Sequence, residues 1–181
     1  NFTYFASARI MDVLIGSIIG LLGVWLVGRR SASGRIPHLI SKTIRSQAQL
    51  LIILFSDQGK GLKSRENRGL SKMKTNIYNL KTLYNTALGE IPADRKALDY
   101  YWTVVFSIEH LGYLLEDCAK TGSRRPLSDE ILAQLLYVCE TMAIAADLKR
   151  SPTMRRVPEI EAFPGIQNEI VNLQKGLQTS D

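Results

Sequence analysis

One long run of hydrophobic residues dominates the amino-terminal part of the chain. It extends from Ile10 to Val27 and is apolar except for Asp12 and Ser17. Such a run reaches about 27 Å as an α-helix at 1.5 Å per residue, close to the roughly 30 Å hydrocarbon core of a bilayer. A secretory signal peptide is the alternative, but the basic residues follow the run instead of preceding it. The pattern therefore predicts a membrane-spanning helix.

Beyond residue 28 the hydrophobic positions recur every three or four residues, which is the spacing of one face of an α-helix. No sustained period-two alternation indicates a strand. Short connections favour an antiparallel bundle, and about 150 residues suffice for one core. We therefore expect an all-α fold, with a transmembrane helix in residues 1–28 and a cytoplasmic antiparallel bundle of four to five helices in residues 29–181. The expected bundle helices are 37–57, 64–88, 92 or 94 to 120, 128–150 and 164–178.

Charge is distributed unevenly along the expected bundle. Residues 29–81 contain twelve Lys or Arg and two acidic residues, whereas residues 82–181 contain ten basic and fourteen acidic residues. Basic residues gather on the cytoplasmic side of membrane helices, so this excess predicts a protein of the cell membrane with its bundle in the cytoplasm. The same charge is expected to attract anionic lipid headgroups near Arg29, Arg30 and Arg35. No nucleic-acid-binding module accompanies it, and we expect no nucleic acid partner.

The expected bundle carries little that indicates catalysis. It has no glycine-rich phosphate loop and no HExxH, GxSxG or CxxC motif. One cluster, Glu109 and His110 with Glu116, Asp117 and Cys118, resembles a metal or acid/base site. These residues do not all share one helical face, so a solvated acidic face with a partly packed histidine is favoured. We expect no enzyme activity, no catalytic residue, no cofactor and no metal.

Two other kinds of side chain in the bundle are expected to be structural. Cys118 and Cys139 are the only cysteines, and a cytoplasmic location predicts reduced, buried thiols. Trp102 and Phe106 belong to an aromatic stripe at helical spacing. Such a stripe is more often core, or a contact with the membrane domain, than a binding site, so we interpret both as packing residues.

Small and ionisable residues share one face of the expected span. Gly16 and Gly20 form a small-xxx-small pair that Gly23 continues, which allows the backbone of another membrane helix to approach closely. Arg9 and Asp12 lie at the outer end of that face. Ionisable residues in or near a membrane are candidates for function, so both are candidates for transport or proton coupling. The alternative is an interfacial ion pair that only fixes the depth of the helix, because Arg9 can extend to the outer surface.

The stretch RIMDVLIG (residues 9–16) is an RxxDxxxG motif that opens the apolar run. Together with NRGLSKMKTNIYNLKTLYNTALGE and WTVVFSIEHLGYLLE, it resembles the fusaric acid resistance protein-like (FUSC) family, also called the aromatic acid exporter family. The resemblance implies a multi-span inner-membrane protein with cytoplasmic helical domains, and some members export aromatic or other organic acids with the proton motive force. Three residues match the motif. The resemblance implies that Asp12 carries a coupling proton, that Arg9 attracts a carboxylate and that Gly16 permits close packing.

Two interpretations of function follow. The first is the carboxyl-terminal portion of a multi-span transporter resembling proton-driven efflux proteins for aromatic or organic acids. It is favoured because one span with a glycine face cannot form a substrate path alone. Its partners are the other transmembrane helices of the same protein, and a homo-oligomer is an open expectation. The second is a single-span, membrane-anchored adaptor or sensor whose bundle binds a protein partner.

Overall fold

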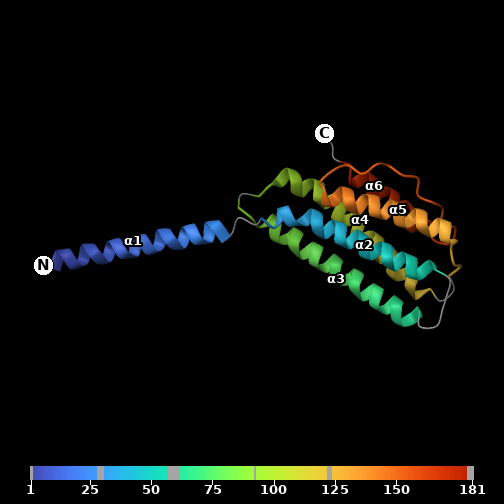
Figure 1. Cartoon of the computed structure of the whole chain (residues 1–181), viewed down its shortest axis with the longest axis horizontal. Helices are drawn as coiled ribbons and strands as arrows, with labels where there is room; N and C mark the ends of the chain where they lie inside the picture. Colours follow the sequence, from blue (N-terminus) through green and yellow to red (C-terminus); the bar gives the residue numbers. More distant parts are fainter. Residues whose placement is uncertain (1, 28–30, 57–61, 92, 122–123, 179–181) are drawn as a thin grey trace. The chain divides into compact units, whose positions relative to one another are not determined.

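The computed structural model describes residues 2–27, 31–56, 62–91, 93–121 and 124–178, with the side chains of 2–8, 25–27 and 62 left out. Throughout these ranges the regular structure is helical, and no strand is present (Figure 1). The expected all-α fold is confirmed. The chain divides into two compact units, Asn1–Ser31 and Ala32–Asp181. The elements are α1 (Phe2–Val27), the short 3-10 helix η1 (Ser33–Arg35), α2 (Ile36–Phe55), α3 (Leu62–Leu88), α4 (Arg95–Lys120), α5 (Asp129–Asp147) and α6 (Pro164–Gly176).

The first unit contains α1, which covers the predicted apolar run. In the part of the chain that the structure describes, no helix has both the length and the apolar character needed to cross a membrane. This finding runs against the transmembrane helix predicted for residues 10–27. The described side chains extend from Arg9 to Val24 and include the charged Asp12. They cover about 24 Å, short of the roughly 30 Å of a bilayer core, and side chains 25–27 lie outside the described residues.

The second unit is an antiparallel bundle of α2 to α6, as predicted (Figure 1). Side-chain pairs show the helix directions. Lys74 of α3 pairs with Glu116 of α4, whereas Lys81, two turns later, pairs with Glu109, so α3 and α4 run in opposite directions. The same order appears in the pairs that join α2 to α5 and α4 to α6: His38 with Asp147, Arg45 with Glu140, Tyr100 with Leu177 and His110 with Glu169.

Helix α2 is the central element of the bundle, because it packs against α3, α4 and α5. Burial on so many sides encloses polar side chains as well as the predicted apolar stripe. Most of their hydrogen-bonding groups are satisfied locally or across the bundle, whereas Oε1 of Gln47 has no partner among the described residues. Thr43 Oγ1 donates to the carbonyl of Leu39 at 2.6 Å, and Ser46 Oγ donates to the carbonyl of Thr43 at 2.7 Å. Burial of polar groups therefore costs little where such bonds form.

The helix ends follow local capping rules. The side chain of Asp94 accepts a hydrogen bond from the backbone N–H of Ala97, and that of Ser128 accepts one from Ile131. Ser128 was the expected start of its helix and Asp94 one of two expected starts, and both satisfy a donor that the first helical turn leaves unpaired. The prediction that the fourth bundle helix reaches residue 150 is wrong. It ends at Asp147, and Lys149 has a left-handed backbone with φ of 53° that cannot continue a helix.

Candidate functional site

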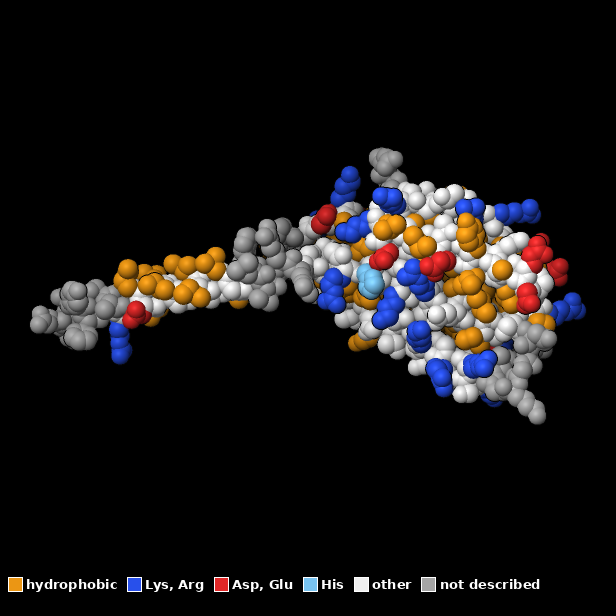
Figure 2. All heavy atoms as spheres, in the orientation of Figure 1, with side chains coloured by type: hydrophobic (Ala, Val, Ile, Leu, Met, Phe, Trp, Pro, Cys, Tyr) orange, Lys and Arg blue, Asp and Glu red, His pale blue; other side chains and the backbone are white. Residues whose placement is uncertain are grey.

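The described surface of α1 is apolar except on the face that carries Arg9, Asp12 and the three glycines. Ten large hydrophobic side chains are between 51% and 73% exposed, and Figure 2 shows hydrophobic side chains along this part of the helix. Burying one Leu or Ile side chain stabilises by roughly 1.5–3 kcal/mol, so such a surface favours apolar surroundings strongly. The ten residues are Ile10, Met11, Val13, Leu14, Ile15, Ile18, Ile19, Leu21, Leu22 and Val24.

The predicted glycine face of α1 is open. A Cβ atom placed at Gly16, Gly20 or Gly23 would meet no atom within 4 Å. Arg9 and Asp12 are both exposed, and the structure forms no ion pair within 4 Å between these two described residues. The glycine face has room for another helix, and the interfacial role of Arg9 and Asp12 stays a prediction. Arg29 and Arg30, two of the predicted lipid contacts, lie outside the described residues, and Arg35 is exposed in η1.

The acidic cluster predicted on α4 is divided among separate partners. Glu109 pairs with Lys81, and Glu116 pairs with Lys74 at 2.9 Å and with Lys120 at 3.3 Å. In the described residues, no group of His, Cys, Asp and Glu side chains is arranged to hold a metal ion. These carboxylates therefore serve as ion-pair partners that link α4 to α3.

His110 points to a different helix. Its Nδ1 atom lies 2.8 Å from Oε2 of Glu169 on α6. The Glu169 carboxylate is nearly buried and also accepts a bond from Asn172 Nδ2 at 3.4 Å. This arrangement fastens α6 to α4.

Ion pairing shifts the pKa values of Glu116, Lys81 and Arg45. The hydrogen bond from Lys74, and then that from Lys120, lowers the pKa of Glu116. The hydrogen bond to Glu109 raises the pKa of Lys81, and that to Glu140 raises the pKa of Arg45. Each shift favours the charged form of the group. None of these groups is therefore prepared to exchange a proton near neutral pH.

Both cysteines are free and buried, as predicted. Burial raises the pKa of Cys118 to about 11 and that of Cys139 to about 12. The thiolate is the reactive form of cysteine, so neither side chain is a nucleophile at neutral pH.

Trp102 and Phe106 do not lie in the core of the bundle, which corrects the first of the two packing roles expected for them, whereas a contact with the membrane domain stays a prediction. They are 58% and 59% exposed on the outer side of α4. The rings form a continuous row, with centroids of Trp102 and Phe106 6.5 Å apart and those of Phe106 and His110 6.4 Å apart. Only Tyr84, which is buried and lies 6.0 Å from Trp102, connects this row to the core among the ring contacts of described residues.

A groove between α3 and α4 has no counterpart in the sequence analysis. Its volume is about 240 Å³, and Tyr78 and Tyr113 lie at its edges. Gly112 lines the groove and lets α3 and α4 approach closely there, since a Cβ atom at this position would overlap Cδ1 of Ile77. In the sequence, this close approach was indicated by a glycine inside a helix whose hydrophobic residues recur regularly. The Lys74–Glu116 and Lys81–Glu109 pairs also line the groove, so their charges are already neutralised.

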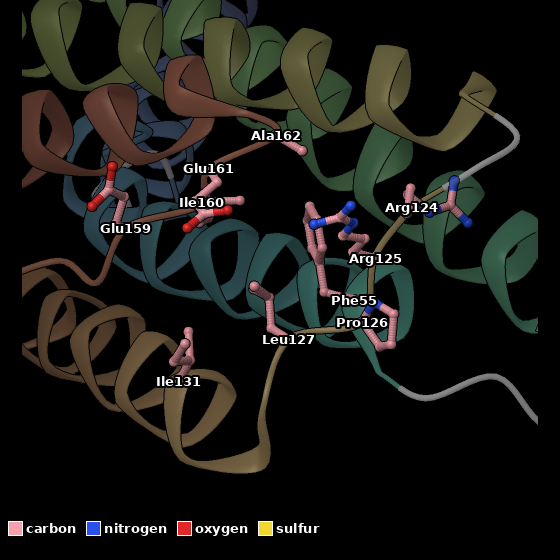
Figure 3. A pocket seen from close by; sticks show the side chains of 10 residues that line it. All are labelled: Phe55, Arg124, Arg125, Pro126, Leu127, Ile131, Glu159, Ile160, Glu161 and Ala162. Carbon is pink, nitrogen blue, oxygen red and sulfur yellow. The ribbon is translucent and has the colours of Figure 1, made fainter.

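A larger hollow of about 630 Å³ lies where α2 ends and α5 begins (Figure 3). Arg124 points away from the other side chains in this view. It donates to the carbonyl oxygens of Leu54, Cys118, Ala119 and Thr121, and pairs with Glu66. This cation is therefore structural. The remaining lining residues are Phe55, Arg125, Pro126, Leu127, Ile131, Glu159, Ile160, Glu161 and Ala162.

Comparison with known proteins identifies a membrane protein as a relative. The chain is 34% identical over 178 residues to the uncharacterized membrane protein YvaC of Bacillus subtilis (strain 168). The match covers 98% of this chain but only 27% of that protein. No protein-family model matches the chain, and no solved structure matches it. The chain is therefore a partial homologue of a membrane protein, while the aromatic acid exporter family is not named by the comparison.

Proposed function

We propose that this chain is part of a multi-span membrane transporter that resembles the proton-driven efflux proteins for aromatic or organic acids. The observation that carries the proposal is the exposure of ten large apolar side chains on α1, outside the face of Arg9, Asp12 and the glycines. Soluble proteins rarely expose an apolar surface of this extent unless it binds something. The chain is homologous to a membrane protein, and a protein of that kind would supply the apolar environment that these side chains favour. The RxxDxxxG motif adds the resemblance to aromatic acid exporters.

In this proposal, membrane helices of the same protein cover α1. Open space at Gly16, Gly20 and Gly23 leaves room for a neighbouring backbone. Association of helices in lipid depends on such close packing, because the lipid tails are as apolar as the side chains. The glycine face is thus the surface at which α1 joins the rest of the protein.

Arg9 and Asp12 act at the end of this face. Because both are exposed and are not paired with each other, their charges are available to other groups. The Arg9 guanidinium attracts the carboxylate of an organic acid. Asp12 takes up and releases the coupling proton, a role that acidic residues of transporters commonly have.

The bundle lies on the cytoplasmic side of the cell membrane in this proposal. The excess of basic residues that follows residue 28 supports that orientation. Arg29, Arg30 and Arg35 then lie near anionic lipid headgroups, each worth about 1 kcal/mol of attraction. The bundle itself contributes neither catalysis nor a cofactor.

The test is export of a panel of aromatic carboxylates from cells that carry the full-length protein. We expect export by the wild type and a loss of at least ten-fold in an Arg9→Gln, Asp12→Asn double variant that still reaches the membrane. Ser17→Ala, a change of the other polar residue of the run, is the matched control and should retain export. Undiminished export by the double variant would show that Arg9 and Asp12 have a structural role only.

The hollow at the end of the bundle favours a second candidate, a membrane-anchored adaptor or sensor that binds a protein partner. It has an apolar lining that includes Phe55 and Leu127, with Arg125, Glu159 and Glu161 also present. An apolar centre with a charged edge is typical of protein interfaces. If wild-type protein in the membrane exports no member of the panel, the adaptor replaces the transporter.

A further inference from the structure

The outer side of α4 carries a pattern that transport does not require. Seven exposed residues follow one another at spacings of four, three, four, four, three and four, which keeps them on one helix face. The order of spacings is the same when read in either direction from Phe106. We call these residues the α4 stripe: Arg95, Asp99, Trp102, Phe106, His110, Tyr113 and Asp117.

The centre of the α4 stripe is aromatic. Trp102, Phe106 and Tyr113 are each more than half exposed. The Phe106 and His110 rings are stacked with an interplanar angle of 23°. Exposed aromatic side chains gathered in this way are enriched in protein interfaces, where they supply a large contact area at low entropic cost.

The two ends of the α4 stripe carry opposite charges. Arg95 is the first residue of α4, and Asp117 lies in its last turn. Both charges oppose the helix dipole, which favours anions at the amino end and cations at the carboxyl end. Neither residue forms an ion pair within 4 Å with another described residue. These two charges do not stabilise α4 itself. A partner surface with the complementary charge pattern would be attracted by them.

We propose that the α4 stripe binds the α4 stripe of a second copy of this chain, antiparallel and related by a two-fold axis at Phe106. The symmetry of the spacing then places Trp102 opposite His110 and Arg95 opposite Asp117 of the second copy. Asp99 comes to lie opposite Tyr113, whose hydroxyl group donates to Oε1 of Glu109 at 3.1 Å in the single chain and would turn to the Asp99 carboxylate of the second copy. A two-fold interface requires such self-complementarity.

Charge decides between the two possible directions. In a parallel pair, Arg95 would face Arg95 and Asp117 would face Asp117, and like charges in contact are repulsive. The antiparallel pair replaces both repulsions by attractions over a stripe about 33 Å long at 1.5 Å per residue. The inference stands on the bundle alone and is independent of the transport proposal.

Disulfide crosslinking of the whole chain in detergent tests the geometry. Phe106→Cys should crosslink to itself, and a mixture of Arg95→Cys with Asp117→Cys should crosslink to each other but neither to itself. Cys118 and Cys139 are buried and remain silent. Leu136→Cys on α5, also exposed, is the matched control. Crosslinking of Arg95→Cys to itself, or no crosslinking above the control, would overturn the proposal.

Charge reversal tests the same pairing without a covalent bond. Arg95→Asp and Asp117→Arg, each alone, should weaken self-association at least ten-fold in sedimentation experiments. Mixing these two variants should restore association, because every facing pair is then again of opposite charge. Association through α1 would not respond to charges on α4. If neither reversal changes self-association, the α4 stripe does not bind a second copy. The same conclusion follows if Trp102→Ala and Phe106→Ala reduce only the binding of the protein to lipid vesicles.

Discussion

The side-chain amide of Gln47 on α2 donates a 2.7 Å hydrogen bond to the backbone carbonyl of Ile108 on α4, in the interior of the bundle. Both residues are essentially buried. The bond fixes α2 against α4 at a site that a sequence pattern would assign to solvent. It is specific for an amide, because the carbonyl oxygen of Ile108 requires a donor.

Replacing Gln47 by Glu keeps the shape of the side chain and removes its donor. We expect Gln47→Glu to lower the free energy of unfolding by about 3 kcal/mol or more at neutral pH, since a buried carboxylate would face a carbonyl oxygen. Thermal unfolding followed by circular dichroism measures the effect. Gln49→Glu, two residues along and exposed, should change stability by less than about 0.5 kcal/mol. Equal effects of the two changes would contradict the buried hydrogen bond.

Arg124 should be essential to the fold, although it lies in a loop. Its guanidinium satisfies carbonyl oxygens at the end of α4 and pairs with Glu66, and both side chains are mostly buried. Arg124→Ala leaves Glu66 without its partner, which costs about 3–5 kcal/mol for a buried pair. The neighbouring Arg125 is exposed, so Arg125→Ala is the control and should be nearly neutral. Chemical denaturation of both variants gives the comparison, and a neutral Arg124→Ala would refute the assignment.

The two cysteines should report unfolding. Burial raises the pKa of Cys118 to about 11 and that of Cys139 to about 12, so almost no thiolate is present at pH 8. We expect no alkylation by iodoacetamide in the folded chain and complete alkylation of both in denaturant. An Ile144→Cys variant places a thiol at an exposed position of α5 and should react without denaturant. Rapid alkylation of either native cysteine in the folded chain would show that the core around it is open.

Acid should weaken the link between α3 and α4. The hydrogen bonds from Lys74 and Lys120 lower the pKa of Glu116 below its value of 4.5 in an unfolded chain. A lowered pKa means that the stabilisation is fully present above pH 4.5 and is lost as the pH falls through the folded value. The melting temperature of Glu116→Gln should therefore fall less than that of the wild type between pH 6 and pH 3, in contrast to Glu161→Gln in an exposed loop. An identical pH dependence in Glu116→Gln and wild type would exclude this contribution.

Hydrophobic spacing was sufficient to predict the helices, because each bundle helix buries one continuous stripe. The expected 64–88, and 92 or 94 to 120, agree with α3 and α4 to within two and three residues respectively. Capping residues fixed the start of α5, since Ser128 has the geometry that its residue type favours. Local rules thus account for the elements and their order.

Tertiary contacts, which the hydrophobic spacing does not reveal, determine which of the remaining side chains are buried and which are exposed. Trp102 and Phe106 have the spacing of core residues, but α3 and α6 pack against the other sides of α4 and leave this one exposed. Gln47 and Arg124 are buried because several elements surround them. A pattern read along one helix contains no information on how many neighbours that helix has.

The central claim is that other helices of a membrane protein cover the glycine face of α1. Gly20→Leu tests it most directly, because nothing within 4 Å would meet a Cβ atom there in this chain. We predict an unchanged melting temperature for the chain alone and a clearly lower one for the full-length protein in detergent, since overpacking an interface costs about 1–3 kcal/mol. Ile18→Leu, on the opposite side of α1, should be neutral in both. A full-length Gly20→Leu protein that melts like the wild type would contradict the account.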